Sequence, residues 1–276
     1  MSNRFAFIND AFIPEEKASL PIQDLSMQRG YGIFDFFRTV NHHPLFLDEH
    51  LERFYYSAEQ MRLAVPYEKE PLKEIIAILL HKNNISASGI RMLLTGGCAP
   101  DGFTITTPNF IITQQLLLPP GKPSIKLTTY SHQRQLPHIK TIDYLMAIWL
   151  QPFLQQRGAD DVLYYHNGVI SECPRANFFV VTQNQKLLTP AHNILKGITR
   201  SKVMQWAQQI VNLEERDVTL ADLKESAEAF ITSTTKGVLP VISIDEVTFN
   251  KGNAGPVTLW LQQQLAATEK SYCPGT

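Results

Sequence analysis

The segment Leu-Lys-Gly-Ile-Thr-Arg at residues 195–200 is the most informative part of this 276-residue chain. Gly197 frees the backbone before an expected helix, and Thr199 is a suitable N-cap for it. Later apolar residues follow one face of that helix: Val203, Trp206, Ala207 and Ile210. Backbone N–H groups, a hydroxyl and the positive helix end meet there, which favours a phosphate site. An ordinary capped helix is the alternative.

A second polar segment follows an apolar strand that ends near Ile231. Residues 232–235 read Thr-Ser-Thr-Thr, and Lys236 and Gly237 come next. Four hydroxyl side chains in a row suit a turn that hydrogen-bonds an anion. A hydrophilic surface loop is the alternative interpretation.

Three arginines lie in apolar surroundings, namely Arg38, Arg53 and Arg91. An isolated guanidinium is very costly to bury, so each needs a partner. A carboxylate within the protein is one possible partner. A substrate carboxylate or phosphate is the other, because the guanidinium fork fits both.

Two further residues are candidates for covalent and acid–base chemistry. Lys140 is flanked by Ile139 and Ile142, and desolvation there would lower its pKa and allow Schiff-base chemistry. A surface lysine is the alternative. Glu172 ends one strand and precedes another, and a turn carboxylate paired with Arg175 is its alternative interpretation.

Composition limits the class of protein. Hydrophobic residues make up 44% and charged residues 18%, which is typical of a globular chain. The net charge of -1 argues against a basic face for nucleic acid. No apolar run is long enough to span a membrane, the three cysteines are widely spaced, and no metal site is indicated. We therefore expect a cytoplasmic protein.

Mixed strands and helices without regular β-α-β alternation predict an α+β fold. The segment around residues 119–123 is rich in proline and glycine and predicts a linker. We expect a small N-terminal α/β domain over residues 1–118, a linker at 119–124, and a larger domain at 125–276. We expect a single helix over Tyr144 to Arg157.

Taken in order, these segments resemble the fold-type IV, or class IV, pyridoxal-phosphate-dependent aminotransferases, from Phe7 to about Ile244. This group includes D-amino-acid and branched-chain aminotransferases and 4-amino-4-deoxychorismate lyase. The matching motifs run through most of the chain: residues 29–32 with Asp35, His50–Arg53, Lys140, Glu172 with 177–179, 195–200 and 232–235. The resemblance implies a two-domain fold whose larger domain holds a barrel-like mixed sheet.

The resemblance also implies the site residues. Lys140 would bind the cofactor, pyridoxal 5'-phosphate, covalently and move the substrate proton. Glu172 would pair with the pyridine nitrogen. The phosphate would be held by Arg53, Ile198, Thr199 and Thr234. Family members place this site between the domains and complete it from a second subunit, so the resemblance implies a homodimer.

The substrate is less clearly indicated. The Arg-x-His pair of familiar D-amino-acid enzymes is missing from residues 95–103. Arg38 and Arg91 align with arginines of branched-chain enzymes, whereas residues 195–200 and 232–235 are most similar to D-amino-acid enzymes. Our hypothesis is a transaminase acting on an amino acid, with D-amino acids slightly favoured, and 2-oxoglutarate or another 2-keto acid. The candidate substrate-binding residues are Arg91, Arg29, Arg38, Tyr31 and Thr235.

Three alternatives remain open at this stage. The first is a branched-chain L-amino-acid aminotransferase, and the second is 4-amino-4-deoxychorismate lyase. The third is a non-catalytic binding protein that keeps the fold, which the presence of both Lys140 and Glu172 argues against.

Overall fold

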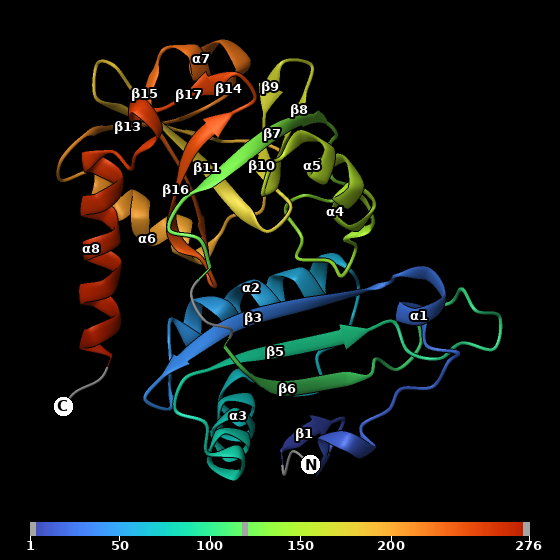
Figure 1. Cartoon of the computed structure of the whole chain (residues 1–276). Coiled ribbons are helices and arrows are strands. Elements are labelled where there is room, and N and C mark those ends of the chain that lie inside the picture. Colours follow the sequence, from blue (N-terminus) through green and yellow to red (C-terminus); the bar gives the residue numbers. More distant parts are fainter. Residues whose placement is uncertain (1–3, 118–120, 273–276) are drawn as a thin grey trace. The chain divides into compact units, whose positions relative to one another are not determined.

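The computed structural model describes residues 4–117 and 121–272 (Figure 1). The chain divides into two compact units. Within the described residues, the first unit contains 4–117, 139–143 and Tyr272, and the second contains 121–138 and 144–271. Residues 119 and 120 of the predicted linker lie outside the described residues. The short segment 139–143 is folded into the first unit, although both of its neighbours in sequence belong to the second.

The first unit is built on a six-stranded antiparallel sheet in the order β2-β1-β6-β5-β3-β4. Its strands are β1 (Phe5–Ile8), β2 (Ala11–Pro14), β3 (Gly32–Val40), β4 (His43–Pro44), β5 (Ser88–Thr95) and β6 (Phe110–Leu116). Its helices are η1 (Glu15–Lys17), α1 (Leu25–Arg29), α2 (Leu47–Gln60) and α3 (Lys69–Asn83).

The core of the first unit forms where one sheet face meets apolar side chains of α2 and α3. Ile33 and Phe37 of β3 pack there with Leu51 and Phe54 of α2. Because side chains alternate along a strand, Asp35 points to this same face. A fully buried carboxylate therefore lies within an apolar core, and it requires charged or hydrogen-bonding partners.

The second unit contains an eleven-stranded mixed sheet whose main path is β13-β12-β11-β15-β16-β7-β8-β9-β14. β14 also contacts β12, so the path bends back toward its start and is barrel-like. The strands are β7 (Ile125–Ser131), β8 (Asp161–His166), β9 (Val169–Ile170), β10 (Glu172–Cys173), β11 (Ala176–Thr182), β12 (Lys186–Pro190), β13 (Asn212–Arg216), β14 (Val218–Thr219), β15 (Ser226–Ser233), β16 (Gly237–Ile244) and β17 (Val247–Thr248). The predicted α+β class is confirmed.

The helices of the second unit are α4 (Leu145–Trp149), α5 (Gln151–Arg157), α6 (Ile198–Ala207), α7 (Leu220–Lys224), η2 (Asn250–Gly252) and α8 (Pro256–Ser271). The prediction of one helix over residues 144–157 was wrong, because α4 and α5 meet at Leu150. Pro152 has no N–H to donate to the carbonyl of Ile148, which explains the break.

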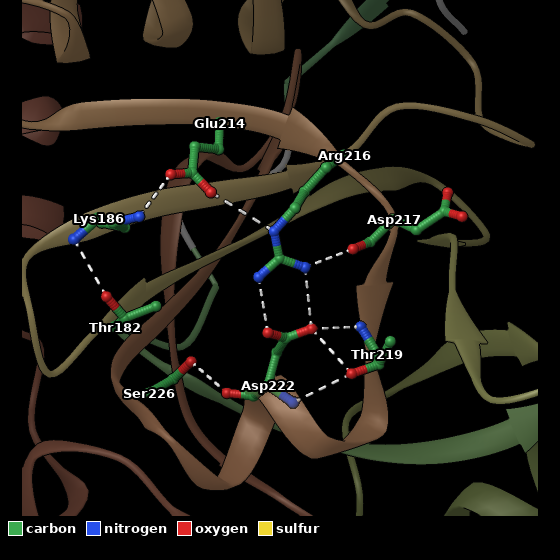
Figure 2. Close-up of polar contacts among 8 residues, drawn as sticks. All are labelled: Thr182, Lys186, Glu214, Arg216, Asp217, Thr219, Asp222 and Ser226. Carbon is green, nitrogen blue, oxygen red and sulfur yellow. Dashed lines mark hydrogen bonds and ion pairs between the residues drawn. The ribbon is translucent and has the colours of Figure 1, made fainter.

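A polar network fixes the edge strand β13 and helix α7 (Figure 2). The two Nη groups of Arg216 donate to the two carboxylate oxygens of Asp222, at 2.7 and 3.1 Å. Asp222 also accepts from the backbone N–H and hydroxyl of Thr219, and Thr219 caps α7 in return. This reciprocal capping satisfies backbone groups at the start of α7.

None of the helices in the described ranges is long and apolar enough to cross a membrane. Across the same ranges, no group of three or more His, Cys, Asp or Glu side chains is placed to hold a metal ion.

Candidate active site

Lys140 is fixed through its backbone to β3 and α2. Its carbonyl accepts from the N–H of Phe34 at 3.0 Å, and its own N–H donates to Oγ of Ser57 at 3.3 Å. On either side of it, Thr141 forms a bridge with Ile33, while Ile139 is buried in the core. These contacts explain why residues 139–143 belong to the first unit. The lysine side chain is half-buried.

The side chains of Lys140 and Arg91 both contact the ring of Phe34. The Lys140 Nζ lies 4.5 Å from the ring centroid, and the guanidinium carbon of Arg91 lies 4.8 Å from it. Arg91 also lies over Phe36, its register partner in β3. Cations are attracted to the negative face of an aromatic ring. The sheet face opposite the core thus brings an amino group and a guanidinium to one aromatic side chain.

Arg91 is exposed. The expectation of a buried guanidinium in an apolar strand therefore does not hold for Arg91, because its side chain leaves the sheet on the face opposite the core.

A buried cluster of Asp35, His50 and Arg53 lies on the core side of β3. Arg53 donates from Nε to Oδ2 of Asp35 at 2.8 Å and from Nη2 to Oδ1 at 2.9 Å. His50 Nδ1 lies 2.7 Å from Oδ1 of Asp35. His50 and Arg53 are three residues apart, so both reach Asp35 from one face of α2. Among the described residues, no protein group accepts from Nη1 of Arg53, so this edge can serve an anion.

The charges in this cluster are set by burial and by the partners. Burial alone would raise the pKa of Asp35, but Arg53 and His50 hold it well below its usual range. Burial lowers the pKa of His50, against the opposing effect of the Asp35 carboxylate. At neutral pH, Asp35 is therefore ionised and His50 neutral, which means that His50 Nδ1 donates to Asp35.

The other substrate candidates of the first unit have different surroundings. Arg38 lies on the same face of β3 as Phe34 and Phe36, one alternation further along the strand. Arg29 is exposed at the end of α1 and donates to the carbonyl of Gln28. Tyr31 donates its hydroxyl to the carbonyl of Met61 at 2.6 Å and packs against the core. Of these candidates, Arg91 contacts the ring of Phe34, which Lys140 also contacts.

In the second unit, Glu172 is buried and accepts from several donors. Arg134 donates from Nη1 to Oε1 at 2.6 Å, while the N–H of Leu195 and Nδ2 of Asn177 donate to Oε2 at 3.0 and 3.3 Å. Asn177 Nδ2 also donates to the carbonyl of Leu195 at 2.7 Å. Because Asn177 links Glu172 to Leu195, the carboxylate is tied to the segment that leads into α6.

The start of α6 has backbone donors and no side-chain cap. Gly197 is the N-cap, and Ile198 and Thr199 are the first two helical residues. The expected N-cap role of Thr199 was therefore wrong by two positions. A Cβ on Gly197 would lie 2.2 Å from Oδ1 of Asn177, so only glycine lets the chain pass this close to Asn177. The N–H groups of the first turn are available to an anion.

The hydroxyl segment lies at the end of β15, on a strand that pairs with β11. Thr232 is opposite Asn177 in the register and is only 1% exposed. Its Oγ1 is buried and has no hydrogen-bond partner within the described chain. Thr234 is half-buried and Thr235 is exposed. A buried unpaired hydroxyl beside Asn177 suggests that a bound group completes the hydrogen bonding here.

The chain is similar to known aminotransferases in sequence and in fold. The sequence profile described as amino-transferase class IV matches residues 32–244. D-alanine aminotransferase of Listeria monocytogenes is 29% identical over 281 residues, covering 96% of each chain. Among solved structures, the T.th. branched-chain amino acid aminotransferase with pyridoxamine 5'-phosphate superposes with a TM-score of 0.90 at 25% identity, covering 99% of this chain and 96% of that one.

The same T.th. enzyme complexed with N-(5'-phosphopyridoxyl)-L-glutamate gives a TM-score of 0.88, again at 25% identity and with 99% and 96% coverage. A putative 4-amino-4-deoxychorismate lyase from Legionella pneumophila gives 0.84 at 26% identity, covering 92% of this chain and 97% of that one.

The chain belongs to the class IV aminotransferase family. It is a pyridoxal-phosphate-dependent transferase with the fold-type IV architecture, as the sequence predicted. Membership of an enzyme family also removes the ground for the alternative of a non-catalytic protein.

Each unit, taken by itself, holds side chains of the chemical kind that pyridoxal phosphate needs. In the first unit, Lys140 carries an amine of the kind that reacts with an aldehyde, and in the second unit Glu172 is a buried carboxylate of the kind that pairs with a ring nitrogen. The unused edge of Arg53 and the α6 N–H groups suit a phosphate. The unpaired buried Oγ1 of Thr232 is the observation that most directly calls for a ligand.

Sequence reasoning gave no role to Phe34, to His50 or to Arg134. The spacing of His50 and Arg53 on a helix was a usable signal, since residues three apart share a face. No sequence signal marks Arg134, because its link to Glu172 depends on where the chain goes after β7.

Proposed function

We propose that the protein is a transaminase that moves an amino group between an amino acid, with D-amino acids favoured, and 2-oxoglutarate or another 2-keto acid. The observation that carries the proposal is the shared contact of Lys140 and Arg91 with Phe34. One small substrate can then present its carboxylate to a guanidinium while its amino carbon lies near the lysine.

The cofactor contacts are proposed residue by residue. Pyridoxal phosphate, when bound, supplies a reactive aldehyde and a ring that accepts electrons. Lys140 would hold the cofactor covalently, and its Nζ, once the incoming amino acid has displaced it, would move the proton at the substrate Cα. Glu172 pairs with the ring nitrogen. Arg53, the N–H of Ile198 and the hydroxyls of Thr199 and Thr234 bind the phosphate.

The substrate carboxylate is assigned to Arg91 of β5, with Arg38 of the neighbouring strand β3 on the same sheet face. A guanidinium binds a carboxylate with two parallel hydrogen bonds, which fixes the orientation of the substrate as well as its position. Tyr31 has a packing role in our proposal, because its hydroxyl is already bound to a backbone carbonyl. Thr235 is exposed and stays a prediction.

The preference for D-amino acids rests on the curated relatives, which are D-alanine aminotransferases with nearly full-length similarity. The choice of 2-oxoglutarate is supported by the adduct with L-glutamate in the T.th. branched-chain enzyme. Glutamate and 2-oxoglutarate each carry two carboxylates, which two arginines on one sheet face, Arg91 of β5 and Arg38 of β3, would suit.

The test is the variant Arg91→Ala, with Arg157→Ala as its control on an exposed arginine at the end of α5, outside this sheet face. Loss of a charge-assisted contact is expected to raise the KM for amino and keto acids roughly 10- to 100-fold. Arg157→Ala is expected to leave the KM unchanged, whereas Arg29 stays a predicted substrate-binding residue. An unchanged KM in Arg91→Ala for every substrate means that this residue does not bind the carboxylate.

Substrate class is tested with D- and L-amino acids and with 2-oxoglutarate and pyruvate as acceptors, followed by half-reaction spectra. Faster reaction with L-branched-chain amino acids than with any D-amino acid would favour the branched-chain alternative instead. The similarity to a putative lyase keeps 4-amino-4-deoxychorismate lyase as a second candidate. Release of pyruvate from aminodeoxychorismate without any keto-acid acceptor identifies that activity.

We also propose that the protein is a homodimer whose second subunit completes the site. Helix α4 supports this, because Ile148 and Trp149 are 64% and 63% exposed on a single helical turn. Exposed apolar side chains that cluster in this way mark interaction surfaces. Sedimentation is expected to give a dimer for the natural protein and a monomer for Trp149→Glu. The cytoplasmic location stays a prediction of the sequence.

A further inference from the structure

Arg134 occupies a buried position beside Glu172 in the second unit. The distance from its Nη1 to Oε1 of Glu172 is 2.6 Å, and the two side chains are only 13% and 5% exposed. The arginine lies in the segment after β7, whereas Glu172 begins β10. A close ion pair between distant parts of the sequence therefore lies at the residue that we assign to the cofactor ring.

The other oxygen of Glu172 already has neutral donors, the N–H of Leu195 and the amide of Asn177. These donors orient the carboxylate without adding a charge. The guanidinium of Arg134 places a permanent positive charge beside Oε1, and this charge favours the ionised form of the carboxylate. The two sets of contacts thus separate orientation from charge.

A purely structural role explains this pair poorly. Removing two charges from water costs free energy that their mutual attraction often fails to recover, so buried ion pairs are weak evidence for stability. A charge beside a reactive group has a second effect, because it changes the proton affinity of whatever the carboxylate contacts. An anionic glutamate favours a protonated ring nitrogen, and a nearby guanidinium opposes this influence.

We propose that Arg134 is a positioning residue that keeps Glu172 ionised and limits how strongly Glu172 favours protonation of the cofactor ring. This inference rests on the proposed function, in which Glu172 contacts the ring nitrogen. Arg134 acts through Glu172 and is not itself assigned to the substrate or the cofactor.

The experiment is a pH titration of the absorbance of the bound cofactor in the holoenzyme, with no substrate present. It uses the natural protein, Arg134→Gln, Arg134→Lys, Glu172→Gln and the double variant. Loss of the positive charge in Arg134→Gln is expected to raise the midpoint of this absorbance titration by about one pH unit. Arg134→Lys keeps the charge and is expected to stay close to the natural midpoint.

The double variant provides the decisive comparison. In the Glu172→Gln background, Arg134→Gln is expected to cause a much smaller shift, because Arg134 acts through that carboxylate. Equilibrium dialysis with pyridoxal phosphate checks that each variant still binds the cofactor. The inference is overturned if Arg134→Gln has the same titration midpoint as the natural protein. It is also overturned if Arg134→Gln shifts the midpoint equally in the natural protein and in the Glu172→Gln variant.

If Arg134→Gln does not fold, the comparison is made with Arg134→Met and Arg134→Lys, which keep most of the side-chain volume. A midpoint that is the same in these two variants overturns the proposal. A wrong assignment of Glu172 to the cofactor ring would be recognised by a different result. Glu172→Gln alone would then change neither the affinity for the cofactor nor the absorbance spectrum of the bound cofactor.

Discussion

Two arginine–carboxylate pairs in this protein have similar bonds but different surroundings. Arg53 and Asp35 lie on the core side of β3 in the first unit, whereas Arg216 and Asp222 lie at a sheet edge of the second unit (Figure 2). Both pairs have two hydrogen bonds between the side chains. Asp35 is fully buried, while the side chain of Arg216 is 40% exposed.

The two pairs differ most in how many guanidinium N–H groups of the arginine are left without a protein acceptor. The guanidinium of Arg216 is surrounded by protein acceptors, since it also contacts Glu214 and the carbonyl of Asp217. Arg53 uses only Nε and Nη2, and its Nη1 has no protein acceptor among the described residues. An arginine fully used by the protein stabilises the fold, whereas one with a remaining edge can also bind a ligand.

The largest effect expected from this comparison is that of Arg53→Gln. It leaves the Asp35 carboxylate buried without its counter-ion, which is expected to cost about 3–5 kcal/mol of unfolding free energy. Affinity for pyridoxal phosphate is also expected to fall at least roughly tenfold, from loss of a charge-assisted bond. Urea unfolding of the apoprotein and equilibrium dialysis measure the two quantities.

Arg216→Gln is the control for that variant. It is expected to lower the unfolding free energy by only about 1 kcal/mol and to leave cofactor affinity unchanged. Equal losses of cofactor affinity in the two variants would remove the distinction drawn between the pairs.

A smaller effect is expected from Gly197→Ala. The new Cβ would meet Oδ1 of Asn177 at 2.2 Å, so the start of α6 or the amide of Asn177 must move. We expect a loss of about 1–3 kcal/mol in stability, as for other overpacked sites, together with weaker cofactor binding. Gly121→Ala is the matched control, since nothing lies within 4 Å of its added Cβ. Thermal unfolding and dialysis of both variants test this.

The smallest effect concerns pH and Asp222. Hydrogen bonds from Arg216, opposed by burial, lower the pKa of Asp222 to about 2. The unfolded carboxyl has a pKa of about 3.9, so the native state binds fewer protons than the unfolded state between these values. Asp222 therefore stabilises the fold fully above about pH 4, and this contribution is lost as the pH falls toward 2.

The measurement for Asp222 is urea unfolding of the natural protein and Asp222→Asn between pH 6 and pH 3. The difference in unfolding free energy, about 1 kcal/mol at pH 6, is expected to shrink as the pH falls. A difference that stays constant over this range would show that the ionised carboxylate is not the source of the stabilisation.

Much of the fold was predictable because the motifs occur in a family order and the apolar periodicities are clear. The α+β class and the helix that became α6 were both predicted from the pattern of apolar residues. The sequence could not show that residues 139–143 pair with the start of β3, because that depends on backbone hydrogen bonds between distant segments. The break at Leu150 was readable from Pro152 but was missed.

The candidate site was predictable in its residue types and less so in its contacts. Arg91 was expected to need a buried partner, yet strand alternation puts it on the open face over Phe34 and Phe36. The pairing of Arg134 with Glu172 has no local signal, because 38 residues separate the two in sequence. Local patterns thus indicate which residues matter, whereas long-range pairing decides which of them meet.

The most direct test of the central claim is reduction of the holoenzyme with borohydride, followed by peptide mass spectrometry. Reduction converts the bond between the cofactor and its lysine into a stable amine. The account predicts one phosphopyridoxyl label, on Lys140, and none in Lys140→Ala. A label on another lysine, or no label in a protein that binds the cofactor, would contradict the assignment of Lys140.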